Sequence, residues 1–168
     1  MVADCPRAHC IWPIVMNTYA QYLLSENVFL NVRAANKWQA FALIAELLER
    51  SCQINRALVY EKLYERENMD TTGLGNGVAI PHAQVAGITQ PVAAYVRLQT
   101  AIDFAAPDER PVSDLLIVLL PMKTTRDHLQ ILADIAALLC EPQSRARLIE
   151  AASVGEVLNC LQSPSLTA

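Results

Sequence analysis

The sequence predicts an α/β fold in which a mixed β-sheet is covered by helices on both faces. Apolar residues make up 53% of the 168 residues and charged residues 18%, which is typical of a packed domain. The run LLIVLL, residues 115–120, is continuously apolar, as expected of a strand buried on both faces. Segments with helical periodicity come before, between and after the apolar runs. Helices are therefore expected on each side of a sheet.

Three longer helices are predicted where a capping residue precedes apolar residues at spacings of three and four. Asn36 is expected to cap a helix to about residue 50, Asn55 one to about residue 65, and Thr125 one to about residue 140. The residues expected on the buried faces are Trp38, Phe41, Ala42, Ala45 and Leu48 in the first helix, Leu58, Val59 and Leu63 in the second, and Leu129, Leu132, Ala133, Ala136 and Leu139 in the third.

Shorter elements are expected between and after these helices. Residues 78–80 and 92–98 are apolar and are predicted to be strands, the first of which ends at Pro81. Residues 144–152 are expected to form a short helix. Another helix should follow Ser153, where a capping-box pattern begins.

One domain is expected from residue 16 to residue 162. Residues 1–15 have no periodicity and are predicted to be an N-terminal extension, and residues 163–168 a frayed tail. No apolar stretch reaches the roughly 18 to 20 residues that span a bilayer. The five cysteines are irregularly spaced, which indicates a reducing compartment. We therefore expect a cytoplasmic protein without direct membrane insertion.

The charge pattern argues against nucleic acid as a partner. The formal net charge is −4, and the basic residues are scattered rather than gathered in a run that could grip a phosphate backbone. Neither an HExxH motif nor a zinc-type Cys/His spacing occurs, and no GxSxG elbow is present. A metal site, a serine hydrolase and a bound cofactor are therefore not expected.

The segment TTGLGNGVAIPHA, residues 71–83, has three glycines within five positions. It is not a P-loop, because no lysine follows the glycines, and it is not a dinucleotide fingerprint, because the glycines precede a strand. Two interpretations remain open. The glycines form a turn that needs positive φ angles, or they let the backbone and the hydroxyls of Thr71 and Thr72 approach a ligand.

Two of the three histidines are candidates for chemistry. His82 follows a predicted strand, and His128 lies in the first turn of a predicted helix. A helix N-terminus attracts anions and favours neutral, nucleophilic imidazole. His128 can equally be a surface residue beside Asp127. His9 lies in the irregular leader, and no chemical role is expected for it.

Three segments together carry a specific resemblance. They are RENMDTTGLGNGVAIPHA at residues 66–83, DERPVSDLLIVLLP at 108–121 and DHLQILADIAALL at 127–139. In this order they resemble the mannitol/fructose-type enzyme IIA domains of the bacterial phosphoenolpyruvate-dependent phosphotransferase system (PTS), most closely the free-standing nitrogen type. Ala83 departs from the family pattern, in which glycine is common after the histidine.

The resemblance implies the enzyme IIA fold and an enzymatic PTS component with a phosphohistidine intermediate. His82 would accept a phosphoryl group from a small NPr/HPr-like phosphocarrier protein that docks on an apolar rim. His128 would hydrogen-bond this group, and Arg66 would offset its charge. The residues expected to support the site are Thr71, Thr72, Gly73, Gly75, Gly77 and Pro81.

The resemblance also implies a function in nitrogen regulation. Signal transduction would then work through regulatory target proteins that respond to the phosphorylation state of this phosphoprotein. The alternative is a sugar-specific, fructose/mannitol-type enzyme IIA that passes phosphate to an enzyme IIB of a permease. A third class is a non-catalytic interaction domain, against which the presence of Arg66, His82 and His128 argues.

Overall fold

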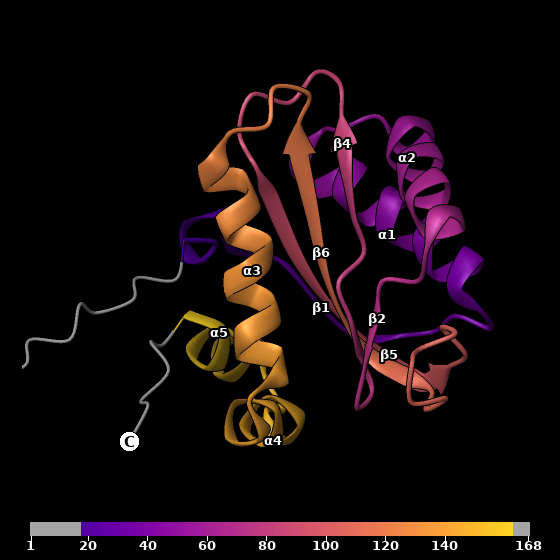
Figure 1. Cartoon of the computed structure of the whole chain (residues 1–168), viewed down its shortest axis with the longest axis vertical. Helices are drawn as coiled ribbons and strands as arrows, with labels where there is room; N and C mark the ends of the chain where they lie inside the picture. The colour runs from indigo at the N-terminus through magenta and orange to yellow at the C-terminus, as the bar shows by residue number, and fades with distance from the viewer. Residues whose placement is uncertain (1–17, 163–168) are drawn as a thin grey trace, which may run out of the picture.

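The computed structural model describes residues 18–162, so the predicted extension at residues 1–15 and the predicted tail at 163–168 lie outside the described residues. One mixed sheet lies between two layers of helices (Figure 1), which confirms the predicted fold class. In chain order the elements are a 3-10 turn at Ala20–Tyr22, β1 Leu23–Val32, α1 Lys37–Cys52, α2 Arg56–Met69, β2 Gly73–Gly75, β3 Val78–Ala79, β4 His82–Val85, β5 Val92–Ile102, β6 Val112–Pro121, α3 Arg126–Cys140, α4 Pro142–Glu150 and α5 Val154–Gln162.

The strand β6 is central to the sheet, whose strand order is β1-β5-β6-β3-β2, with β4 also paired to β6. Its side chains alternate between two hydrophobic cores. Leu115 and Ile117 pack in the core under α1 and α2, and Leu116 and Val118 pack in the core under α3, α4 and α5. This double burial explains why LLIVLL is apolar throughout and confirms the expectation for this strand.

The strands β3 and β4 are two pieces of one extended segment beside β6. Ala79 pairs with Leu115 and His82 with Val118, so the parallel register is the same on both sides of Pro81. Proline has no N–H to donate, but the carbonyl of Pro81 still accepts from the N–H of Val118 at 2.9 Å. Although Pro81 separates β3 from β4, His82 therefore remains paired with β6, the most buried strand of the sheet.

The three predicted caps are confirmed. The side chain of Asn36 accepts a hydrogen bond from the N–H of Gln39 at the start of α1, and Asn55 accepts from the N–H of Leu58 at the start of α2. Thr125 caps α3. Helix α2 continues to Met69, one turn beyond the predicted end, so Arg66 lies within its last turn rather than after it.

The predicted buried face of α3 was partly wrong: Leu139 is buried and Leu132 and Ala136 pack against the core, but Leu129 and Ala133 do not. The buried residues are Ile131, Ile135, Leu138 and Leu139, whereas Leu129 is 59% exposed and Ala133 is also exposed. Both phases fit the apolar sequence of this helix, because alanines and leucines occur on more than one side. The difference between the predicted and the observed orientation of α3 matters for function, because it leaves Leu129 exposed to solvent.

Smaller corrections concern α1 and the short strands. On α1, Ala42 is exposed, while Ala40 and Ile44 are buried. The strands β1, β2 and β4 had not been predicted. At the start of α5 the hydroxyl of Ser153 accepts from the N–H of Glu156 at 3.3 Å, as predicted, but the carboxylate of Glu156 accepts from the N–H of Ala152, one residue before the cap. Within residues 18–162, none of the helices combines the length and the apolar character that a membrane crossing requires.

Candidate functional site

The ring of His82 is held through both of its nitrogens. Arg66 Nε donates to His82 Nε2 at 3.1 Å, and an arginine nitrogen can only donate. The Nε2 atom therefore accepts and carries no proton. The Nδ1 atom lies 2.8 Å from the carbonyl oxygen of Ile80 and donates its N–H to it. The arrangement assigns the tautomer with the proton on Nδ1 and the lone pair on Nε2.

The guanidinium of Arg66 is fixed by the end of its own helix. Its NH1 nitrogen donates to the carbonyl of Asp70, four residues on, at 2.9 Å. The side chain thus reaches from the last turn of α2 to the start of β4. With five N–H donors, a guanidinium can exchange its contact with Nε2 for a contact with an anion bound there.

Burial keeps His82 in its neutral form. Removal of the ring from water lowers its pKa below the ordinary value of 6.5, and the positive charge of Arg66 lowers it further. The bond to the Ile80 carbonyl and the charge of Glu67 act in the opposite direction but are outweighed. A neutral imidazole has an unprotonated nitrogen that can act as a nucleophile once its hydrogen bond is released.

His82 and Arg66 line an open hollow of about 470 Å³ between α2 and α3. Its rim carries three large apolar side chains, Met69, Met122 and Leu129, which are 81%, 59% and 59% exposed. A smaller hollow of about 220 Å³ shares His82 and Arg66 and reaches Thr72 and Gly73. His82 therefore lies in an open hollow beside three exposed apolar side chains rather than in a closed cavity.

The structure places His128 in the first turn of α3, close to the hollow but not in its lining. Its Nδ1 accepts from the backbone N–H of Thr125 at 3.2 Å, so the proton of its neutral ring is on Nε2. Leu132, one turn further along the same face of α3, does line the hollow. His128 thus has an Nε2–H that can donate, and the next residue, Leu129, lines the hollow.

The glycines have a structural explanation in the hairpin of β2 and β3. Gly75 pairs with Val78, and the two residues between them, Asn76 and Gly77, have φ angles of 53° and 80°. This is the asparagine–glycine pattern of a type I′ turn, which requires positive φ at both positions. A Cβ at Gly73 would lie 3.0 Å from Ala106 Cβ, so this glycine is needed for close packing.

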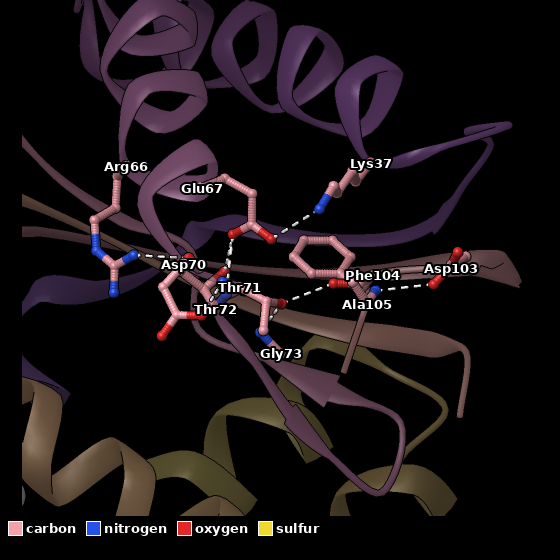
Figure 2. A network of polar contacts seen from close by, with 10 residues as sticks. All are labelled: Lys37, Arg66, Glu67, Asp70, Thr71, Thr72, Gly73, Asp103, Phe104 and Ala105. Atoms are coloured by element: carbon pink, nitrogen blue, oxygen red, sulfur yellow. Dashed lines mark hydrogen bonds and ion pairs between the residues drawn. The ribbon is translucent and has the colours of Figure 1, made fainter. Parts of the chain in front are cut away.

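The two threonine hydroxyls are engaged inside the protein. Thr71 Oγ1 donates to the carbonyl of Phe104 at 2.7 Å, and Thr72 Oγ1 donates to Glu67 Oε2 at 2.6 Å (Figure 2). They therefore shape the strand that leads to His82 instead of pointing to a ligand. Of the two interpretations of this segment, the turn is the one that the geometry supports.

Sequence reasoning did not identify Glu67 and Lys37 as parts of this region. Glu67 directly follows Arg66 in the segment RENMDTTGLGNGVAIPHA, and this adjacency was the available signal. Lys37 begins a different helix, and nothing in the sequence connects it to His82. Within the part of the chain that the structure describes, no group of three or more His, Cys, Asp or Glu residues gathers to hold a metal ion.

Comparison with known proteins identifies the class to which this fold and site belong. Residues 21–163 match the family model described as "Phosphoenolpyruvate-dependent sugar phosphotransferase system, EIIA 2". The chain belongs to this family of PTS components, and the resemblance noted from its motifs is confirmed.

Relatives of both branches of the family are similar to the chain. The nitrogen regulatory protein of Pseudomonas aeruginosa is 36% identical over 76% of this chain and 84% of its own. The fructose-specific EIIA component of Haloferax volcanii is 34% identical over 81% of this chain and 89% of its own. The crystal structure of the nitrogen regulatory protein IIA-Ntr from Neisseria meningitidis superposes with a TM-score of 0.80 at 35% identity, covering 84% of this chain and 97% of that one.

A more distant structure shows the same fold. Mannitol IIA of Escherichia coli has a TM-score of 0.67 at 22% identity, covering 82% of this chain and 97% of that one.

Proposed function

We propose that this protein is a nitrogen-type regulatory enzyme IIA that accepts a phosphoryl group on Nε2 of His82. The observation that carries the proposal is the state of that nitrogen. It holds the lone pair of a neutral ring, it borders an open hollow, and a guanidinium lies against it. The donor would be a small NPr/HPr-like phosphocarrier. Phosphoenolpyruvate, the source named in the family description, is made in the cytoplasm, so the protein would act there.

The relatives favour the nitrogen-type function over the sugar-type alternative. Nitrogen regulatory proteins from Pseudomonas aeruginosa and Escherichia coli are 36% and 35% identical to the chain, and the structure with a TM-score of 0.80 is also of the nitrogen type. The fructose-specific relative at 34% identity keeps the sugar-type enzyme IIA as the second candidate. Transfer of the phosphoryl group to a sugar-specific enzyme IIB would support that second candidate.

The transfer step balances without metal or nucleotide. The lone pair of His82 Nε2 attacks the phosphorus of the carrier's phosphohistidine as the carrier's P–N bond breaks. The electron pair of that bond returns to the carrier's ring, which leaves as neutral imidazole with a proton on its other nitrogen. His82 keeps its proton on Nδ1, donated to the Ile80 carbonyl, so its phosphorylated ring carries the positive charge that the carrier's ring gives up. Arg66 would leave Nε2 and bond the phosphoryl oxygens, and the Nε2–H of His128 would provide a second donor.

The apolar rim around the hollow would make partner binding depend on whether His82 is phosphorylated. Met69, Met122 and Leu129 surround the hollow, and phosphorylation would place a doubly charged group among them. A partner that buries this rim against an apolar surface would be disfavoured by the charge, and a partner with basic groups would be favoured. The phosphorylation state would therefore choose between target proteins.

The test is phosphorylation by phosphoenolpyruvate, the first PTS enzyme and a small phosphocarrier. We expect wild type to gain an acid-labile, base-stable label, as a P–N bond requires, and His82→Ala to gain none. His9→Ala is the matched control and should be labelled like wild type. His128→Ala should be labelled more slowly, still on His82, because it lacks one donor to the phosphoryl group. A full label on His82→Ala would refute the proposal.

A further inference from the structure

Glu67 is a buried carboxylate next to the site that the transfer step does not use. It is 4% exposed, and both of its oxygens are engaged (Figure 2). Oε1 accepts from Lys37 Nζ at 3.2 Å. Oε2 accepts from the backbone N–H of Thr72 at 3.0 Å and from its hydroxyl at 2.6 Å. A buried charge is costly unless it is paired in this way.

A hydrogen-bonded path leads from Glu67 to the imidazole. Thr72, which Glu67 holds by two bonds, accepts from the N–H of Ile80 through its own carbonyl at 3.0 Å. The carbonyl of Ile80 accepts from His82 Nδ1 at 2.8 Å. Thr72 therefore holds the backbone of Ile80 through its N–H, and the carbonyl of the same residue, which lies in the next peptide group, determines which ring nitrogen keeps the proton.

A second path reaches the other nitrogen from the same helical turn. Arg66 precedes Glu67 and donates to His82 Nε2 at 3.1 Å, while its NH1 rests on the Asp70 carbonyl. The last turn of α2 thus holds Nε2 through Arg66 and holds Nδ1 through Glu67 and Thr72. If this turn shifted, both contacts of the ring would be lost together.

We propose that Glu67 is a positioning residue that keeps His82 as the Nδ1–H tautomer and leaves Nε2 as the attacking nitrogen. This inference rests on the proposed phosphoryl transfer for its consequence, but not for its geometry. The residue must be a carboxylate, because three donors converge on it. A glutamine would turn its NH₂ group toward either the ammonium of Lys37 or the N–H and hydroxyl of Thr72.

The test compares wild type, Glu67→Gln and Glu61→Gln by ¹⁵N NMR of histidine-labelled protein at about pH 8, where imidazole is neutral. Glu61 lies on the same helix in an exposed pair with Lys62, so Glu61→Gln is the matched control. In wild type and control we expect His82 with a protonated Nδ1 and a free Nε2. In Glu67→Gln we expect a mixture of the two tautomers. A carboxylate with a merely structural role would not change this signal.

The rate of transfer is the second readout. Misplacement of an attacking atom by about 1 Å costs on the order of 100-fold, so we expect Glu67→Gln to slow phosphorylation roughly 10- to 100-fold. The carrier concentration at half-maximal rate should not change, because Glu67 is buried and cannot touch the carrier. Thr72→Val, which keeps the backbone N–H bond and loses the hydroxyl bond, should act in the same direction to a smaller extent.

The inference is overturned if His82 keeps the wild-type tautomer in the folded variants, or if the tautomer changes and transfer does not slow. If Glu67→Gln fails to fold, the tautomer of His82 and the rate of transfer in Thr72→Val provide the test instead. The tautomer is read without any phosphoryl donor. If wild type cannot be phosphorylated at all, the proposed function fails, and the NMR comparison still decides whether Glu67 positions the ring.

Discussion

His82 and Arg66 show at the residue scale how the fold keeps a histidine ring neutral, with one defined nitrogen unprotonated, as the proposed transfer requires. Burial and the adjacent guanidinium lower the pKa of the ring, and the Ile80 carbonyl holds the proton on Nδ1. The cost is that the folded protein resists protonation of His82 more than the unfolded chain does. This cost makes stability depend on pH.

We expect the free energy of unfolding to fall as the pH drops below about 6.5, the pKa that an unfolded histidine has. The folded pKa of His82 is lowered, so in this window the unfolded chain binds a proton that the folded ring refuses. The stability is fully present above this window and stops changing below the folded pKa. His82→Gln should remove this contribution.

Urea unfolding at a series of pH values between about 8 and 5 measures this effect as the difference between wild type and His82→Gln. The comparison cancels groups that titrate in both proteins. Equal pH dependence in the two proteins would show that the environment of the ring does not penalise its charged form.

The site residues were predictable from sequence to the extent that they lie in one continuous motif. Arg66 and His82 stand in the same segment, and the structure brings them into direct contact. The partnership of Glu67 with Lys37 was not predictable, because it joins two helices and depends on how they pack. The bonds of the Thr71 and Thr72 hydroxyls were equally hidden, since a hydroxyl can serve a ligand or a backbone.

At the scale of elements, the most useful correction to the sequence-based prediction concerns which side chains of helix α3 are buried. Its sequence is apolar on several sides, so periodicity alone could not choose the phase. Packing on the sheet buries Ile131 and Ile135 and leaves Leu129 exposed at the rim of the hollow. The strand β4 was missed because it is four residues long, and β1 because Ser25, Glu26 and Asn27 interrupt its apolar pattern.

We expect Leu129→Glu to weaken docking of the phosphocarrier. A charge at an apolar contact costs about 1 to 2 kcal/mol, which corresponds to a roughly 5- to 30-fold higher carrier concentration at half-maximal transfer. The free energy of unfolding should hardly change, because the side chain is 59% exposed. Kinetics of label transfer at several carrier concentrations measure the effect.

Ile149→Glu is the matched control, because Ile149 is 57% exposed on α4, which lies at the opposite end of α3 from β4 (Figure 1). It should leave transfer as in wild type. If the two glutamate variants have the same kinetics, the rim is not the docking surface.

At the scale of the whole molecule, the sheet assembles the site from elements that are distant in the sequence. The strand β6 pairs with β4 on one side and with β5 on the other. Helices α2 and α3 cover opposite faces of the sheet (Figure 1), and residues from the last turn of α2 and the first turn of α3 line one hollow together with His82. The fold class could be predicted, because alternating helices and a doubly buried strand allow few architectures. The tandem pairing of β3 and β4 with β6 could not, because it depends on long-range register.

The central claim is that Nε2 of His82 carries the phosphoryl group. It is tested most directly by ¹⁵N–³¹P coupling in the phosphorylated, histidine-labelled protein. We predict coupling to Nε2 of His82, with Nδ1 still protonated. Coupling to Nδ1 of His82, or to either nitrogen of His128, would contradict the account.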